Sequence, residues 1–544
     1  MIEDLWYKNA VIYCLDVETF MDGNGDGIGD FIGLTRRLDY LAGLGITCLW
    51  LQPFYRSPNR DNGYDIADYY AVDPRLGDLG DFVGFTHQAK QRGMRVIIDL
   101  VVNHTSNEHP WFTTARTDPQ SKFRDFYLWS KDKPSDAHRG MVFPGEQKST
   151  WTWDEAAGAW YYHRFFDFQP DLNISNPAVR SEILKIMGFW LEVGVSGFRV
   201  DAVPFLIERR GHSETKGHAY EFLNDMRQFL TWRRGDAILL AEANVEWEQA
   251  SELFGDGTRM QMVFNFAVNQ AFYVALVKED VRPLAKAIGT DIGLHDTAQW
   301  AQFLRNHDEL DLGRLSTADR KRVFEALGPD ERMQIYDRGL RRRLAPMLNG
   351  DRAKLELVHS LLMALPGTPV LWYGDEIGMG EDLELDQRTA VRTPMQWSTE
   401  PNAGFSTTEQ IVRPIVRGKF GPERVNVADQ RRKQGSLLNF IERLIRTRKD
   451  APEVGWGQVR VLKSGDPAIL ALRYDWNDRT VITLHNFAAK VRTATLSKAD
   501  APARLANIIT SDHSEPTKKG GHSIELPAHG FRWYRMGHDD APGV

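Results

Sequence analysis

The sequence predicts an α/β protein built on a (β/α)8 TIM barrel, and three observations support this fold class. Short apolar runs alternate with amphipathic helical stretches from residue 10 to about residue 450. Several runs are apolar at consecutive positions, which is typical of strands buried on both faces in a parallel sheet. Eight strand-then-helix units follow one another, as a TIM barrel requires. An open doubly wound sheet is the alternative, but no glycine-rich phosphate loop follows the first run.

The eight predicted strands are short and rich in Val, Ile, Leu and aromatic residues. In chain order they are AVIYCLDV from Ala10, ITCLWLQP from Ile46, RVIIDLVV from Arg95, GFRVDA from Gly197, AILLAEA from Ala237, MQMVFNF from Met260, AQFLRNHD from Ala301 and TPVLWYGDE from Thr368. Helical patterns fill the gaps between them. One begins at Phe31 and stops at Gly43 and Gly45, and another opens with Pro177, which suits a first helical turn.

Two segments depart from this alternation. Residues 105–175, after the third strand, are rich in aromatic residues, Asp and Pro, and they are too long for a plain βα loop. We expect a small inserted domain there, over the barrel mouth. After residue 452 short β segments are separated by Gly, Asp, Asn and Lys, which predicts a C-terminal antiparallel β-sandwich. The predicted domains are therefore a barrel over 1–104 and 176–452, an inserted domain over 105–175 and a sandwich over 453–544.

Composition and charge exclude several classes of partner. The content of 42% hydrophobic and 26% charged residues is that of a soluble protein. A net charge of −7 argues against nucleic acid or an anionic membrane as a partner. There is no apolar run of about 18 residues, so no membrane-spanning helix is expected. No secretory signal is recognised, and Cys14 and Cys48 lie in apolar runs, which predicts buried thiols and a cytoplasmic location.

Polar side chains are concentrated where four of the predicted strands end. They are Asp99, Asn103 and His104 after the third strand, Arg199 and Asp201 after the fourth, Glu242 after the fifth, and Asn306, His307 and Asp308 after the seventh. The active site of a TIM barrel lies at this end of its strands, where an unpaired buried charge is costly. A salt-bridged strand end is the structural alternative for any one of them, but four such ends together favour catalysis.

The residue types suit retaining cleavage of a glycosidic bond, which needs a carboxylate nucleophile and a carboxylic acid as proton donor. Arg199 points to the same side of its strand as Asp201, and its charge is expected to keep Asp201 ionised. Glu242 follows the apolar stretch ILLA, where desolvation raises a carboxyl pKa and favours the acid form. Asp308 is expected to bind sugar hydroxyls as the ring distorts in the transition state.

Six ordered segments resemble the signature regions of the α-amylase family, glycoside hydrolase family 13. They are DLVVNH from Asp99, QPDLN from Gln169, GFRVDAV from Gly197, AEAN from Ala241, FLRNHD from Phe303 and GDEIG from Gly374. The resemblance covers almost the whole chain. It implies Asp201 as nucleophile, Glu242 as acid/base and Asp308 as transition-state stabiliser. The substrate-binding residues expected around the −1 sugar include His104, Phe165, Gln169, Arg199 and His307.

Two further segments resemble those of exo-acting members of the family. DNGYDIADY and VRTPMQW place Asp61, Tyr64 and Arg392 where such enzymes close the −1 pocket. The resemblance implies that an Asp61–Arg392 pair grips the non-reducing end of one glucose and that Tyr64 stacks on its ring. A −1 pocket that is closed beyond this non-reducing end implies that the substrates are short α-glucosides, such as disaccharides. Without the resemblance, a surface ion pair between Asp61 and Arg392 is the alternative.

Within the family, GDGIGDF, LQPFYRSP, SGFRVDAVPFL and FLRNHDEL resemble the trehalose synthase branch, whereas the segments after AEAN and FLRNHDEL depart from it. We therefore expect a small α-glucoside substrate, such as maltose or trehalose, and isomerisation of maltose to trehalose. An exo-acting α-glucosidase that hydrolyses maltose, isomaltose or related sugars is the alternative. A non-catalytic relative is expected to lack one of the three carboxylates, and all three are present. The oligomeric state stays open, a homo-oligomer included.

The segment DGNGDGIGD places oxygen-bearing side chains at alternate positions with glycines between them, which suits Ca²⁺. Its twelfth position is Gly33 rather than Glu, so an EF-hand is excluded. The family resemblance implies a structural Ca²⁺ held by four side chains and one carbonyl, those of Asp22, Asn24, Asp26 and Asp30 and that of Ile28. A metal-free turn is the alternative, and no organic cofactor is expected.

Overall fold

The computed structural model describes residues 3–208, 218–518 and 520–537 of the 544-residue chain. Eight parallel strands close into a barrel, which confirms the predicted TIM barrel. In order around the barrel they are β1 (Ile12–Leu15), β16 (Thr368–Trp372), β12 (Gln299–Phe303), β11 (Met262–Phe264), β10 (Ile238–Ala241), β9 (Gly197–Val200), β5 (Arg95–Leu100) and β2 (Cys48–Leu51). Each predicted apolar run contributes one of them, and Cys14 and Cys48 are buried free thiols, as expected.

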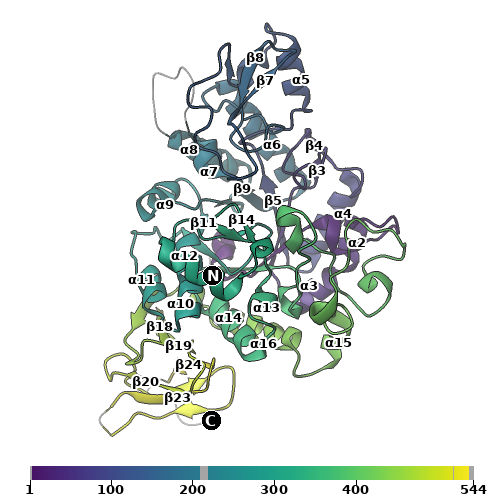
Figure 1. The fold of residues 1–544 in the computed structure, drawn as a ribbon. Helices are drawn as coiled ribbons and strands as arrows, with labels where there is room; N and C mark the ends of the chain where they lie inside the picture. The colour runs from purple at the N-terminus through teal and green to yellow at the C-terminus, as the bar shows by residue number, and fades with distance from the viewer. Residues whose placement is uncertain (1–2, 209–217, 519, 538–544) are drawn as a thin grey trace.

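Helices surround the barrel (Figure 1). The longer ones are α4 (Leu79–Gln91), α6 (Pro177–Val193), α8 (Tyr220–Arg233), α10 (Phe266–Lys278), α12 (Thr317–Leu327), α14 (Arg352–Ala364) and α16 (Leu437–Asp450). The helix expected from Phe31 is two helices, α2 (Phe31–Arg36) and α3 (Leu38–Leu44), with a break at Arg37. At the end of α3, Gly45 has φ 96°, and a Cβ there would lie 2.8 Å from Ile445 of α16. Only glycine fits this left-handed, closely packed helix end.

Between β5 and α6 the chain forms the inserted segment, at the top of Figure 1. It holds α5 (Pro110–Thr117) and a three-stranded antiparallel sheet in the order β6 (Trp129–Ser130), β8 (Ala159–Tyr162), β7 (Trp151–Asp154). Another small sheet lies later in the chain, outside the inserted segment, and the sequence analysis did not predict it. It comprises β13 (Leu310–Asp311), β15 (Gly339–Leu340) and β14 (Gln334–Ile335).

The C-terminal strands form two antiparallel sheets at the end of the molecule opposite the inserted segment (Figure 1). One sheet has the order β17 (Gln458–Leu462), β18 (Ile469–Trp476), β19 (Arg479–Asn486), β24 (Phe531–Met536), β21 (Leu505–Asn507), β22 (His513–Ser514). The other pairs β20 (Arg492–Leu496) with β23 (His522–Leu526). A separate cluster of buried side chains from both sheets forms their core. Among the described residues, no helix is long and apolar enough to span a bilayer.

Candidate active site

A cavity of about 600 Å³ lies where the strands β5, β9, β10 and β12 end at the barrel mouth. Eight of the eleven residues predicted to be catalytic or substrate-binding line it: Asp61, Tyr64, His104, Phe165, Gln169, Asp201, Glu242 and Asp308. The other three, Arg199, His307 and Arg392, lie directly behind this wall, and each is at most 1% exposed. The fold therefore brings the whole predicted set to one place, although the residues are spread over more than 300 positions of the sequence.

Arg199 is the electrostatic centre of this wall. The strand register places Arg199 of β9 opposite Asp99 of β5, and their side chains form an ion pair of 2.5 Å. The same guanidinium contacts Asp201 Oδ1 at 2.5 Å and Glu242 Oε2 at 2.8 Å. One buried cation thus faces three carboxyl groups. Burial of a carboxylate costs free energy unless a counter-charge is near. The Arg199 guanidinium therefore stabilises these three buried carboxyl groups close to one another.

The carboxyl groups of Asp201 and Glu242, which line the cavity, differ in pKa. Burial raises the pKa of Asp201 to about 6, against the opposing effect of Arg199. Burial also raises the pKa of Glu242 to about 7, again opposed by Arg199, while Asp201 adds to the increase. At neutral pH Asp201 is therefore mainly ionised while Glu242 retains a proton in much of the population. This is the division that a nucleophile and a general acid need.

Ala202, directly after Asp201, helps to orient Glu242 and was not predicted from the sequence. Its φ of 49° places a non-glycine residue in the left-handed region. In this conformation its N–H donates a hydrogen bond to Glu242 Oε2, with a distance of 3.1 Å. Strained backbone of this kind persists where surrounding structure enforces it, and it occurs often at functional sites.

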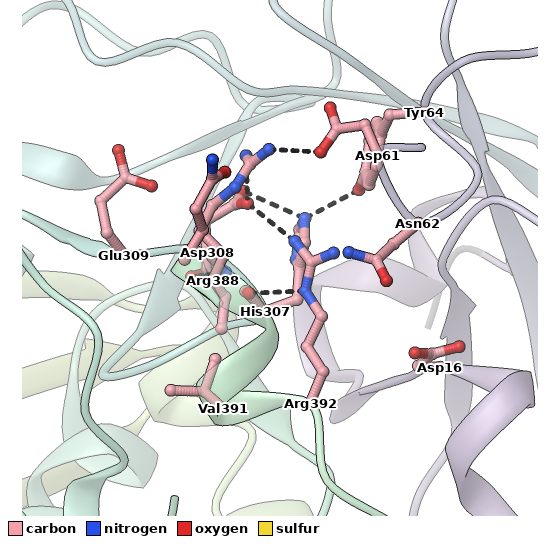
Figure 2. A network of polar contacts seen from close by, with 12 residues as sticks. Asp16, Asp61, Asn62, Tyr64, His307, Asp308, Glu309, Arg388, Val391 and Arg392 are labelled. Carbon is pink, nitrogen blue, oxygen red and sulfur yellow. Dashed lines mark hydrogen bonds and ion pairs between the residues drawn. The ribbon is translucent and has the colours of Figure 1, made fainter. Parts of the chain in front are cut away.

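Asp308 lies in a second polar cluster, shown in Figure 2. His307 Nε2 is 3.0 Å from Asp308 Oδ2 and 2.7 Å from the Tyr64 hydroxyl. Burial lowers the pKa of His307 to about 3, so the ring is neutral. Although burial alone would raise the pKa of Asp308, the contacts with His307, Arg388 and Arg392 hold it well below its ordinary value. Asp308 is thus ionised and ready to accept hydrogen bonds.

The expected pairing of Asp61 with Arg392 is wrong. Asp61 Oδ1 pairs instead with Arg388 Nη2 at 2.7 Å, and Arg388 Nη1 contacts Asp308 Oδ1 at 2.8 Å (Figure 2). Arg392 is fully buried, where it donates to the His307 carbonyl at 2.9 Å and contacts Asp308 at 3.2 Å. These contacts hold its guanidinium beneath Asp308. Arg388, one short helical turn earlier in the chain, takes the position beside Asp61.

Replacement of Arg388 tests this arrangement. We expect Arg388→Ala to lower kcat/KM on a disaccharide substrate about tenfold to a hundredfold, since a charge-assisted hydrogen bond contributes about 1.5–3 kcal/mol. Arg388→Lys keeps the charge but loses the bidentate contact, so its kcat/KM should lie between those of Arg388→Ala and the unmodified protein. Steady-state kinetics measure the effect. An unchanged kcat/KM in Arg388→Ala, with only a lower unfolding temperature, would leave the guanidinium a purely structural role.

The remaining predicted sugar-site residues pack against one another. His104 Nε2 lies 2.9 Å from the Tyr64 carbonyl, and its ring lies 5.1 Å from that of Phe165. Gln169 Nε2 donates to Asp61 Oδ2 at 3.0 Å. These contacts fix the side of the cavity next to the Asp61–Arg388 ion pair.

The cavity is also lined by residues that the sequence analysis missed. They include Phe143, Phe205, Asn244, Glu309, Asp311 and Arg338. Burial raises the pKa of Glu309 to about 7, and its carboxylate lies 3.4 Å from Arg338. Glu309 directly follows Asp308, and that adjacency was the one available signal. Phe143 comes from the inserted segment, whose loops carry no periodic pattern.

The loop from Asp22 to Asp30 has the donor chemistry for Ca²⁺ but is closed partly by its own hydrogen bonds. Asp22 accepts backbone N–H groups of Asn24, Gly25 and Gly27 at 2.6–3.1 Å. Asp30 accepts those of Gly23, Asn24 and Gly33 at 2.6–3.0 Å. Within the described parts of the chain, no three His, Cys, Asp or Glu side chains are grouped to hold a metal ion. A Ca²⁺ site here therefore also needs the oxygens of Asn24 and Ile28, and it stays a prediction.

Comparison with known proteins places this site in a family. The family model for the alpha amylase catalytic domain matches residues 14–457. A trehalose synthase of Pimelobacter sp. is 39% identical over 99% of this chain and 97% of its own length. One of Thermus thermophilus is 41% identical over 98% of this chain, which spans 56% of that relative. The crystal structure of an α-amylase from H. orenii has a TM-score of 0.80 at 26% identity, covering 97% of this chain and all of the other. The chain therefore belongs to the α-amylase family, glycoside hydrolase family 13.

Proposed function

We propose that this protein converts maltose to trehalose by double displacement with retention of configuration. The observation that carries the proposal is that one guanidinium, that of Arg199, holds both Asp201 and Glu242 beside the cavity that Asp308 also lines. Retaining enzymes keep their two carboxyl groups about 5–5.5 Å apart and inverting ones about 6.5–9.5 Å, so a shared guanidinium favours retention. The names of the relatives that are 39% and 41% identical support trehalose formation.

In the first displacement, Asp201 attacks the anomeric carbon of the non-reducing glucose of maltose while Glu242 donates its proton to the glycosidic oxygen. The carbon–oxygen bond breaks, a β-glucosyl ester forms on Asp201, and free glucose and ionised Glu242 remain. Asp308 accepts hydrogen bonds from sugar hydroxyls as the ring flattens. Because Asp308 is ionised, these bonds strengthen as positive charge develops on the ring.

In the second displacement, Glu242 removes the proton from the anomeric hydroxyl of the retained glucose. That oxygen attacks the glucosyl ester, Asp201 leaves as a carboxylate, and the two anomeric carbons become joined as in trehalose. Glu242 regains its proton, so the cycle closes. If water reaches the ester first, the product is glucose, and the enzyme then behaves as a hydrolase.

Incubation with maltose, followed by chromatography of the sugars, tests the proposal. Trehalose as the main product supports it, with the Asp201→Ala protein as a control for contaminating activity. Glucose as the only product would instead establish an exo-acting α-glucosidase. Absence of any conversion would contradict both functions. The cytoplasmic location stays a prediction from the sequence.

The pH dependence follows from the two tuned carboxyl groups. Below about pH 6 Asp201 becomes protonated and loses its nucleophilicity, and above about pH 7 Glu242 ionises and has no proton to donate. We therefore expect a bell-shaped profile of kcat/KM with its maximum between these values, the two limbs belonging to the coupled pair. Initial rates of maltose conversion across the neutral range measure it. A profile without an alkaline limb would contradict the assignment of Glu242.

We also infer that the loop from Asp22 to Asp30 holds a structural Ca²⁺. Its donors are all oxygen atoms, which Ca²⁺ prefers, and the ion would brace the turn without a part in the reaction. EDTA is expected to lower the thermal unfolding temperature by several degrees, and added Ca²⁺ to restore it, because an ion that binds only the folded state stabilises it. Asp22→Asn should respond to neither. Equal unfolding temperatures with and without EDTA would contradict the site.

A further inference from the structure

The sheet of the inserted segment packs on α5 with only one of its two faces. The register pairs Trp151 with Tyr162 and Trp153 with Trp160 across β7 and β8. Side chains two residues apart on a strand share a face, so these four rings form one surface, here named the aromatic face. On the opposite face, Trp129 and Tyr161 contact Phe112 of α5. The aromatic face is therefore not needed to hold the sheet to its helix.

Two pairs of rings make up the aromatic face. Trp153 is 39% exposed, and its ring lies 5.9 Å from that of Trp160. The Lys133 ammonium lies 5.1 Å from the Trp160 ring, at the solvent edge. Trp151 and Tyr162 form a second pair 5.2 Å apart, about 7 Å further along the strand. Tyr162 is buried, whereas Trp151, Trp153 and Trp160 are at least partly exposed. Three large rings that reach solvent on one face are a costly arrangement in water and commonly mark a binding surface.

A cavity of about 1080 Å³ opens at the Trp151–Tyr162 end of the aromatic face. Its wall combines these rings with side chains that donate or accept hydrogen bonds, among them the exposed Arg139 and Asp136. Apolar rings beside donors and acceptors suit a neutral carbohydrate, because a sugar presents flat C–H faces and a rim of hydroxyl groups. A lipid or an apolar protein surface would not satisfy these polar groups.

This cavity adjoins the active-site cavity. Gly140, Arg164 and Glu208 line both of them. Arg164 Nη2 pairs with Glu208 at 2.7 Å, and Arg164 Nη1 donates to the Gly140 carbonyl at 2.7 Å. The partition between the two cavities is thus a set of side-chain and backbone contacts rather than a layer of core. A ligand bound in the larger cavity lies next to the site proposed for α-glucosides.

We propose that the aromatic face and its cavity form a second carbohydrate-binding site, which binds an α-linked glucan of several glucose units beside the active site. The choice of an α-linked glucan rests on the proposed function, since it is the polymeric form of the sugars expected in the neighbouring cavity. The volume exceeds that of the active-site cavity, which accommodates a disaccharide in the proposed reaction. The rings that reach solvent, those of Trp151, Trp153 and Trp160, offer separate stacking positions to successive sugar units of one chain.

The test measures binding in an enzyme that cannot turn over its ligand. In an Asp201→Ala background, isothermal titration with maltoheptaose and electrophoresis in gels containing glycogen report on short and polymeric glucans. We expect the further changes Trp153→Ala and Trp160→Ala together to weaken maltoheptaose binding at least tenfold and to abolish retardation by glycogen. Trp153→Phe with Trp160→Phe should largely keep both, because a ring remains to stack.

Trp232 provides the matched control, since it is 77% exposed on α8 and lines neither of the two cavities. Trp232→Ala should bind both glucans as the Asp201→Ala protein does. Equal binding by the Trp232→Ala protein and the Trp153→Ala, Trp160→Ala protein would overturn the second site, as would absence of any glucan binding. Maltose turnover is measured separately with Asp201 intact. If maltose is not converted while glucan binding depends on the two tryptophans, only the proposed function fails.

Discussion

Asp201→Ala protein is expected to turn over maltose at least about 10⁴-fold more slowly than the unmodified protein, because no other group can form the glucosyl ester. The fold should survive. Arg199 would keep Asp99 and Glu242 as partners, at 2.5 and 2.8 Å, so no buried guanidinium is left without a counter-charge. Maltose turnover by chromatography and thermal unfolding by circular dichroism measure the two effects.

Azide distinguishes loss of a nucleophile from general damage. With α-glucosyl fluoride as substrate, azide can enter the space left by the Asp201 side chain, attack the anomeric carbon from that face and displace fluoride. The product is then β-glucosyl azide, with inverted configuration. Formation of the α-anomer, or maltose turnover near the normal rate in Asp201→Ala, would remove Asp201 from the role of nucleophile.

The barrel was predictable because its strands are buried on both faces. A run such as ILLA of β10 is apolar at every position, and its four residues are all fully buried. The sheet of β13, β14 and β15 carries no such signal, since each strand has only two residues. Tertiary contacts hold it, among them those of Arg338 with Glu309 and Asp311, both 3.4 Å long. Local sequence cannot specify strands that exist through such contacts.

The active site likewise contains residues whose place follows from local sequence and residues whose place depends on tertiary contacts. Asp201 and Glu242 follow apolar strands directly, so their place at the barrel mouth follows from the strands themselves. Arg388 and Arg392 lie on an irregular segment around a 3₁₀ turn, Gln387–Val391. Which of them reaches Asp61 depends on the path of that turn and on the depth at which Arg392 is buried. The family resemblance implied Arg392 at this position, and Arg388 was not singled out.

Glu242→Gln is expected to reduce maltose turnover about 10³- to 10⁴-fold, which is the upper part of what a general acid contributes. The amide fills the same space, and its oxygen can still accept the Ala202 N–H, but it cannot protonate the glycosidic oxygen. Arg199 retains Asp99 and Asp201, so the folded structure should persist. Maltose kinetics and thermal unfolding measure these outcomes.

The leaving group shows whether the lost function is proton donation. Fluoride needs no protonation to leave, so Glu242→Gln should retain far more activity in the first displacement of α-glucosyl fluoride than of maltose. Added azide should speed the second displacement without help from a base and yield α-glucosyl azide, the anomer opposite to that from Asp201→Ala. Since Glu242 is the group that ionises near pH 7, the alkaline limb of the fluoride profile should also be absent. Equal losses on both substrates would mean that Glu242 positions the sugar rather than transfers the proton.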